Sequence, residues 1–312
     1  GWVLQECILA PRVLYFGSDQ ILWQCRETDQ SETFPAGYSW VDSVMNELGK
    51  VMKLGRHRES GKMNNEAIAF WIDIVEQYSE CTLTNQTDRL PAIAGIAKFF
   101  KDITGEEYLA GMWESRPDRM LSWRVFSPQK IESPEYRAPS WSWISTEGRL
   151  IFAEIPFRKA DSPKLLDFHI GAQGPDNLTG ISEGYIKLRA DILRVEVARN
   201  RKRDILRVSD KNGLKISLVF SPDRLNTRLR KGDKLALICL GIADDDSVND
   251  DPGSDSSSSA TTLRYIVHYL VLFEVFDSAS SEARYRRVGY GRCGKISRYI
   301  ECDSAIEDIT II

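Results

Sequence analysis

The first side chains that could do chemistry are Gln5 and Glu6, within the opening stretch GWVLQECILA. A carboxylate at the end of a helix, such as Glu6 here, can orient a ligand or act as a general base. The alternative is that Glu6 caps its helix or forms a salt bridge. We favour this structural role, because the partner groups that a catalytic site needs are missing around it.

A pair of tryptophans, Trp141 and Trp143 in the stretch SWSW, is the second candidate. In an extended strand both indoles would lie on one face, with Ser140 and Ser142 on the other. Exposed indoles could stack against a sugar or a base, as in a carbohydrate-binding module. Buried indoles would instead cover a layer of helices, and this is the arrangement that we expect.

The histidines and cysteines form no recognisable site. His57, His169 and His268 have no Cys, Ser or Asp neighbour at catalytic or metal spacing, and the very apolar surroundings of His268 predict a core position. No nucleotide-binding, zinc-protease or nucleophile-elbow motif is present. The sequence therefore predicts neither a metal nor a cofactor. Six cysteines without a CxxC pair favour reduced thiols in a cytoplasmic protein: Cys7, Cys25, Cys81, Cys239, Cys293 and Cys302.

Charge and hydropathy exclude two classes of partner. The 312 residues carry a net charge of −4, which gives no general attraction to nucleic acid or anionic lipid. No stretch approaches the roughly 20 apolar residues of a membrane span. The basic segment RNRKRDILR, residues 199–207, could contact phosphate or an acidic partner, but a solvated turn between two strands is the better interpretation.

The elements that position these residues begin with a short helix and a hairpin. The helix covers about residues 2–9 and ends before Pro11. The runs RVLYFG and QILWQC, separated by a turn at Gly17, predict two strands of a hairpin. These elements bury too little surface to be stable alone.

Two longer helices follow. The first has apolar residues at helical spacing and Asn64 or Asn65 as its cap. The second, in TDRLPAIAGIAKFF, is expected to have Asp88 as cap and Pro91 in its first turn, and to end at Gly105. GEEYLAGMW and RMLSWRVF are expected to form shorter apolar elements of the same layer.

The apolar period changes from helical to alternating after Pro134. Strands are predicted at YRAPSWSWIS, RLIFAEI, YIKLRADILRVEVAR, LKISLVF, KLALICLGI, YIVHYLVLFEVF, ARYRRVGYG and AIEDITII. The apolar parity flips at Ile192–Leu193, which predicts a bulge. The acidic, serine-rich segment 243–262 is expected to be a disordered loop.

Several stretches closely resemble a known family, the fungal heterokaryon incompatibility (HET) proteins. The last motif of the HET domain reads approximately Arg-Gly-Trp-x-Leu-Gln-Glu-x-x-Leu-x-x-Arg, followed by an aromatic strand and Trp-x-Cys. The matching residues here are Gly1, Trp2, Leu4, Gln5, Glu6, Leu9, Arg12, Phe16, Trp23 and Cys25.

The resemblance continues into the region that often follows that domain. In the family's order the chain has WIDIVEQYS from Trp71, DRLPAIAGIA from Asp88, YLAGMW from Tyr108 and APSWSW from Ala138. The two earlier HET motifs are absent. We therefore expect the chain to be the C-terminal portion of such a protein, beginning inside the last motif.

The resemblance implies an α+β protein in three parts. These are a remnant helix-hairpin of the HET domain (1–35), a helical region (36–135) and a predominantly antiparallel β region (136–312). It also implies fungal non-self recognition that ends in regulated cell death, with this chain as a non-catalytic accessory region.

The same resemblance leaves an enzyme open. HET domains have been compared with the TIR fold, some of whose members cleave NAD, so the full-length protein could consume a nucleotide. The motif residues Trp2, Gln5, Glu6 and Arg12 would be the family's contribution in this chain. The expected partners are other proteins or the missing N-terminal HET region.

Overall fold

The computed structural model describes most of the chain. The described residues are 1–25, 27–37, 63–128, 136–154, 162–174, 178–202, 205–244, 265–275, 282–294 and 304–312. They form two compact units, which we describe separately. The first contains residues 1–115 and 170–182, and the second contains residues 116–169 and 183–312. The boundary after Ser115 lies earlier in the chain than the expected start of the β region.

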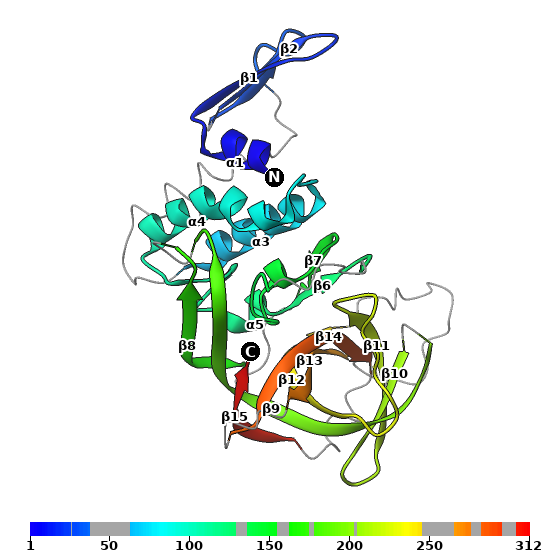
Figure 1. Cartoon of the computed structure of the whole chain (residues 1–312). Helices are drawn as coiled ribbons and strands as arrows, with labels where there is room; N and C mark the ends of the chain where they lie inside the picture. Colours follow the sequence, from blue (N-terminus) through cyan, green and yellow to red (C-terminus); the bar gives the residue numbers. More distant parts are fainter. Residues whose placement is uncertain are drawn as a thin grey trace, which may run out of the picture. The chain divides into compact units, whose positions relative to one another are not determined.

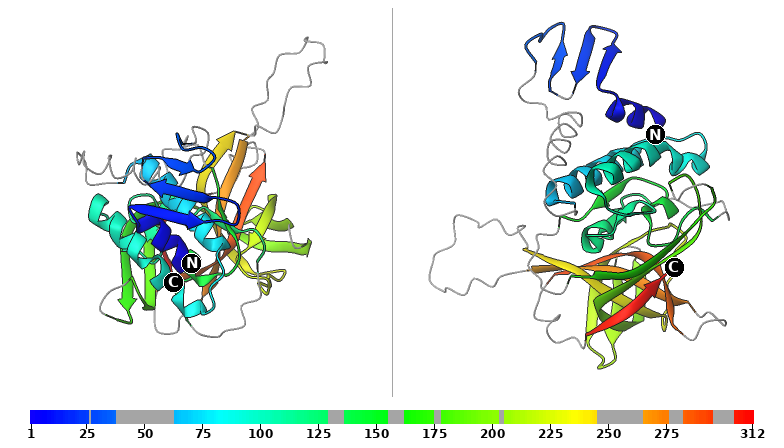
Figure 2. Two further views of the ribbon diagram at one scale, coloured as in Figure 1. Left: turned by 90° about the horizontal axis from the view of Figure 1, so that it is seen from above. Right: turned by 90° about the vertical axis from the view of Figure 1, so that its left-hand side faces the viewer.

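The first unit opens with the expected helix and hairpin. Helix α1 spans Trp2–Leu9, and strands β1 (Arg12–Phe16) and β2 (Ile21–Cys25) pair antiparallel. A short strand β3, Asp29–Ser31, extends the hairpin to three strands (dark blue in Figure 2). Ile8 is the buried residue of α1, and its other side chains are at least partly exposed.

The two long helices confirm the predicted pattern, with one correction. Helix α3 spans Asn65–Glu80, and the Asn64 side chain caps it by accepting a hydrogen bond from the Ala67 amide. Helix α4 spans Pro91–Thr104 and ends at Gly105, which has a φ of +74°. The prediction that Asp88 caps α4 is wrong. A 3-10 helix, Gln86–Arg89, leads directly into α4, so no side chain caps that end.

An aromatic cluster forms the core of this unit. The Trp71 ring lies edge-on to Phe100, Tyr108 and Trp113, with ring centroids 5.4, 5.8 and 5.3 Å away. Tyr108 and Trp113 come from a small hairpin, β4 (Tyr108–Leu109) and β5 (Met112–Trp113). The hairpin's two turn residues have positive φ, as in the tight turns that suit hairpins. The stretch expected as an element of the helical layer is therefore a hairpin.

The second unit begins with short elements. They are helix α5 (Pro117–Met120), the antiparallel pair β6 (Trp123–Val125) and β7 (Leu150–Phe152), and a 3-10 turn at Trp143–Ser145. The strand predicted across SWSW is wrong. The Ser142 side chain accepts a hydrogen bond from the Ile144 amide at 3.1 Å, and this local bond favours a turn over an extended chain.

A large sheet makes up the rest of the second unit (Figure 1). Its strands are β8 (Lys164–Ala172), β9 (Ile181–Lys202), β10 (Ile205–Asp210), β11 (Lys215–Pro222), β12 (Lys234–Asp244), β13 (Tyr265–Val275), β14 (Arg284–Gly294) and β15 (Ala305–Ile311). Strands β9 to β15 pair antiparallel, except that β14 and β15 are parallel. The prediction of an α+β chain with a mainly antiparallel C-terminal region is confirmed.

The sheet closes on itself, because β10 pairs with both β9 and β11. Strands β9 to β14 thus form a ring around an apolar interior, visible in the lower part of Figure 1. The interior side chains include Val197, Leu218, Leu237 and Val271, all completely buried. A closed sheet filled by side chains is a rigid support for whatever lies on its outer face.

The bulge predicted at Ile192–Leu193 in strand β9 is absent from its pairing with β12. The pairing of β9 with β12 runs through Ile192 and Leu193 without a register shift, and its pairing with β15 continues regularly from Ile192 to Ile186. The apolar parity changes because even-numbered residues up to Ile192 are buried on one face, whereas Leu193 and later odd-numbered residues point into the ring. The strand thus changes its buried face without gaining a residue.

Two other expectations concern loops and membranes. Of the expected disordered segment 243–262, Ala243 and Asp244 end strand β12, and the remainder lies outside the described residues. Among the helices in the described part of the chain, none has the length and hydropathy needed to cross a membrane.

Candidate functional site

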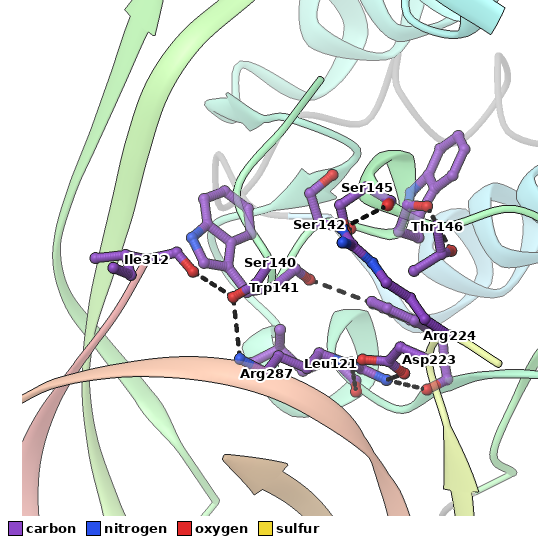
Figure 3. A network of polar contacts seen from close by, with 12 residues as sticks. Leu121, Ser140, Trp141, Ser142, Ser145, Thr146, Asp223, Arg224, Arg287 and Ile312 are labelled. Atoms are coloured by element: carbon purple, nitrogen blue, oxygen red, sulfur yellow. Dashed lines mark hydrogen bonds and ion pairs between the residues drawn. The ribbon is translucent and has the colours of Figure 1, made fainter. Parts of the chain in front are cut away.

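The second unit is organised around a buried arginine on β14. Arg287 donates two hydrogen bonds to the Asp223 carboxylate, at 2.9 and 3.3 Å. It also donates to the main-chain oxygens of Leu121 and Trp123, and its guanidinium lies 3.2 Å from the centre of the Trp123 ring. Burial raises the pKa of Asp223, and the charge of Arg287 offsets part of that rise. The contacts of Arg287 thus join strand β14 to Asp223 and to the segment that contains Leu121 and Trp123 (Figure 3).

Ser140 fixes the neighbouring stretch of β14. Its hydroxyl accepts a hydrogen bond from the Arg287 amide at 3.0 Å and donates one to the main-chain oxygen of Ile312. The Ile312 amide in turn donates to the Tyr285 carbonyl at 2.9 Å. The turn at Ser140 therefore holds β14 and the end of the chain together, as the dashed lines in Figure 3 show.

A cavity of about 740 Å³ lies beside this network, within the second unit. Its lining is rich in positive charge. The arginines in it are Arg137, Arg224, Arg284, Arg286 and Arg287, and the carboxylate side chains in it are Asp223 and Glu183. Asp223 is bound to Arg287 and also offsets part of the positive charge at Arg224.

Three of the arginines are close enough to influence one another. The Arg224 side chain donates to the Ser145 carbonyl at 3.2 Å. Partial burial lowers the pKa of Arg224, and the nearby charges of Arg286 and Arg137 lower it further, whereas those of Asp223 and Glu147 raise it. Arg137 forms an ion pair with Glu147 and is only 12% exposed. Its Nη1 is buried and has no hydrogen-bond partner among the described residues.

The hydroxyl groups of the cavity are already engaged. Ser145 donates to the Ser142 carbonyl and Thr146 to the Trp143 carbonyl, so neither hydroxyl is held by a base as a nucleophile would be. Tyr136 keeps its proton at neutral pH, because burial, together with the nearby charge of Glu183, raises its pKa to about 12. The arrangement suits the binding of an anion better than covalent catalysis.

The family-motif residues lie in the first unit and are used in different ways. The Trp2 indole donates to the Asp88 carboxylate at 3.4 Å, and the Gln5 side chain accepts from the Gly95 amide at 2.7 Å. Both bonds connect α1 to the segment that contains α4. Glu6 and Arg12 are exposed.

Trp141 and Trp143 are both completely buried. The Trp141 carbonyl also accepts a hydrogen bond from the Trp123 indole at 3.4 Å. In this fold neither indole offers a face to a sugar or base, because the turn at Ser142 directs both into the core. The expected core position of the two tryptophans agrees with this burial.

The structure describes two of the three histidines, His268 and His169. His268 is buried, and its Nδ1 is hydrogen-bonded to the hydroxyl of Tyr290. Burial lowers the pKa of His268 to about 4, and the charges of Arg292 and Arg124 contribute to this shift. His169 lies on β8 with its Nε2 3.6 Å from Glu183. His57 and Cys302 lie outside the described residues.

Neither a metal-binding cluster nor a disulfide is found in the described part of the chain. No group of three or more His, Cys, Asp or Glu side chains there could hold a metal ion. No disulfide joins the five described cysteines. The basic segment 199–207 continues β9 to Lys202 and enters β10 at Ile205, with residues 203–204 outside the description.

The arginines of the cavity were not predicted from the sequence. Arg284, Arg286 and Arg287 belong to ARYRRVGYG, which was interpreted only as a strand. The available signal was three arginines within four positions of a strand, an unusual charge density for a sheet. Arg137 and Arg224 come from distant turns, so only the folded chain brings them to the same cavity.

Comparison with known proteins provides no assignment. No family model matches the chain, and no curated protein or solved structure is significantly similar to it.

Proposed function

We propose that this chain is the accessory region of a fungal heterokaryon incompatibility protein, located in the cytoplasm and acting in non-self recognition that ends in cell death. In this role the chain transmits or restrains the activity of an effector domain. It does not catalyse a reaction itself. The proposal rests on the motif resemblance and on one structural observation, described next.

The observation is that the polar residues of the first motif bind the second part of the resemblance. Gln5 and Trp2 belong to the stretch that resembles the end of the HET domain. Their partners, Gly95 and Asp88, belong to DRLPAIAGIA, a motif of the downstream region. A side-chain amide that accepts a bond from a helix amide at 2.7 Å has a positioning role, so the presence of Gln5 in the motif needs no catalytic explanation.

The remaining motifs of the first unit also meet. Trp71 of WIDIVEQYS packs against Tyr108 and Trp113 of YLAGMW and donates to the Gly111 carbonyl at 3.2 Å. Motifs separated by tens of residues thus serve one core. This supports the interpretation that they describe a folding unit into which the end of an effector domain is built.

A genetic experiment tests the proposal. Strains that lack the gene, and the same strains with the full-length gene restored, would each be paired with a panel of wild isolates. Cell death after fusion would be scored in every pairing. We expect death in at least one pairing to depend on the gene. If no pairing depends on it, the proposal is wrong.

Two neighbouring substitutions separate coupling from catalysis. Gln5→Ala in the full-length protein removes the bond to Gly95 and is expected to alter the death response. Glu6→Gln, one position away and exposed, is expected to leave it unchanged at equal protein levels. The reverse result, loss of death only with Glu6→Gln, would favour the alternative of a NAD-consuming enzyme.

A further inference from the structure

We propose that the cavity of the second unit binds a small organic molecule through its phosphate group, held by Arg224 and Arg286, with Arg137 adding to the positive charge of the wall. This inference is independent of the family proposal, because it rests on residues outside the family-motif positions of α1. The argument has four parts: size, charge, pre-organisation and accessibility.

The size of the cavity fits a small molecule. Pockets that bind metabolites usually have volumes of about 300–1,000 Å³, and this one measures about 740 Å³. That space exceeds what a phosphate ion needs, so an organic group can accompany it. The half-exposed Tyr136 ring is part of the wall and offers an apolar surface to such a group.

The charge of the cavity fits an anion. Guanidinium groups stay charged in proteins, so the mutual repulsion of Arg224, Arg286 and Arg137 is not relieved by losing a proton. A bound oxyanion relieves the repulsion that remains between Arg224 and Arg286. Phosphate matches the planar, two-pronged guanidinium better than other common anions because it can accept paired hydrogen bonds from several arginines at once.

The strand that carries Arg286 is held in place before any ligand arrives. Arg286 stands on β14 between Tyr285 and Arg287, both of which are buried and bonded. The Ser140 hydroxyl fixes the β14 main chain one residue further on. A site whose side chains extend from such a rigid strand loses little entropy on binding.

Two of the arginines are also open to solvent. Arg224 and Arg286 are exposed, although both line the cavity, so a ligand can reach them. Arg287, by contrast, is completely buried and occupied by Asp223. We therefore assign Arg287 to the support of the site and not to contact with the ligand.

Titration calorimetry with pyrophosphate on the chain of residues 1–312 tests the inference. We expect saturable binding with a Kd below about 1 mM. Arg224→Gln and Arg286→Gln are each expected to weaken binding about tenfold or more, since hydrogen bonds to charged groups are worth at least that factor. Both residues are exposed, so circular dichroism should show an intact fold.

Two matched variants make the result specific. Arg228→Gln removes an exposed arginine of the same loop that does not line the cavity, and it should leave the affinity unchanged. Glu183→Gln removes the opposing carboxylate from the wall and should tighten binding. Absence of saturable binding, equal losses in Arg224→Gln and Arg228→Gln, weaker binding in Glu183→Gln, or tighter binding of citrate than of pyrophosphate would each overturn the proposal.

Discussion

At the scale of single residues, the buried ion pair of Arg287 and Asp223 illustrates how charge is tolerated in this core. Two charges removed from water are costly unless hydrogen bonds satisfy them. Arg287 meets this condition with the Asp223 carboxylate, two main-chain oxygens and the Trp123 ring. The same bonds tie together segments that are distant in the sequence, so the pair also specifies how the second unit is assembled.

The first prediction concerns this pair. Asp223→Ala leaves the buried Arg287 charge without its partner and is expected to lower the free energy of unfolding by about 3–5 kcal/mol. Urea denaturation would measure the change. The control is Asp308→Ala, which removes an equally well-formed pair with Arg189, at 2.8 and 3.1 Å, from the surface. Only a small change is expected there, because water screens exposed charges. Similar losses in both variants would contradict the argument.

The second prediction concerns His268 and pH. Its pKa in the folded protein is about 4, below the ordinary value of 6.5, so the unfolded chain takes up a proton at a higher pH than the folded one. Stability is therefore expected to fall as pH decreases from about 6.5 toward 4. Between pH 7 and pH 5 this amounts to about 2 kcal/mol.

Urea denaturation at several pH values would measure the effect of His268. The comparison is with His268→Asn, in which this part of the pH dependence should be missing. If the two proteins lose stability in parallel between pH 7 and pH 5, His268 is not the group responsible.

At the scale of elements, close packing between strands limits which residues β14 can carry. A Cβ atom on Gly289 would lie 2.6 Å from the Ser221 main-chain oxygen and from the Phe220 ring. Gly294, on the same strand, has no atom of the described residues within 4 Å of such a position, apart from its chain neighbours. The two glycines have the same chemistry and differ only in the space around them.

This difference gives the third prediction. Gly289→Ala is expected to destabilise the protein by about 1–3 kcal/mol, because β11 and β14 must separate to accept the methyl group. Gly294→Ala should change stability by no more than about 0.5 kcal/mol. Thermal unfolding of both variants checks this. Equal stability of the two would mean that the strands are less tightly packed than described.

At the scale of the whole molecule, the chain contains a cavity suited to binding and uses its motif residues to position helices. The fourth prediction follows: residues 1–312 incubated with NAD should show no cleavage above buffer when the products are separated by chromatography. The expectation rests on the exposed position of Glu6 and the positioning role of Gln5. Turnover that disappears in Glu6→Gln would contradict it and restore the enzyme alternative.

The sequence by itself determined the elements whose signals are local. Helix α3 followed from apolar spacing and the cap at Asn64, and the end of α4 from Gly105. Strand β11 alternates between buried and exposed residues as its sequence predicts. These features depend on neighbours within a few residues, which a linear pattern contains.

The tertiary structure alone decided what depends on distant partners. Arg286 and Arg287 are neighbours on β14 and therefore face opposite sides of the sheet. The buried side can hold Arg287 because Asp223, 64 residues away in the sequence, lies beside it in space. Likewise, the hydroxyl of Ser140 is bonded to Arg287 and Ile312, which lie 147 and 172 residues away in the sequence. Burial and charge pairing result from long-range contacts, and such contacts exist only once the sheet has closed.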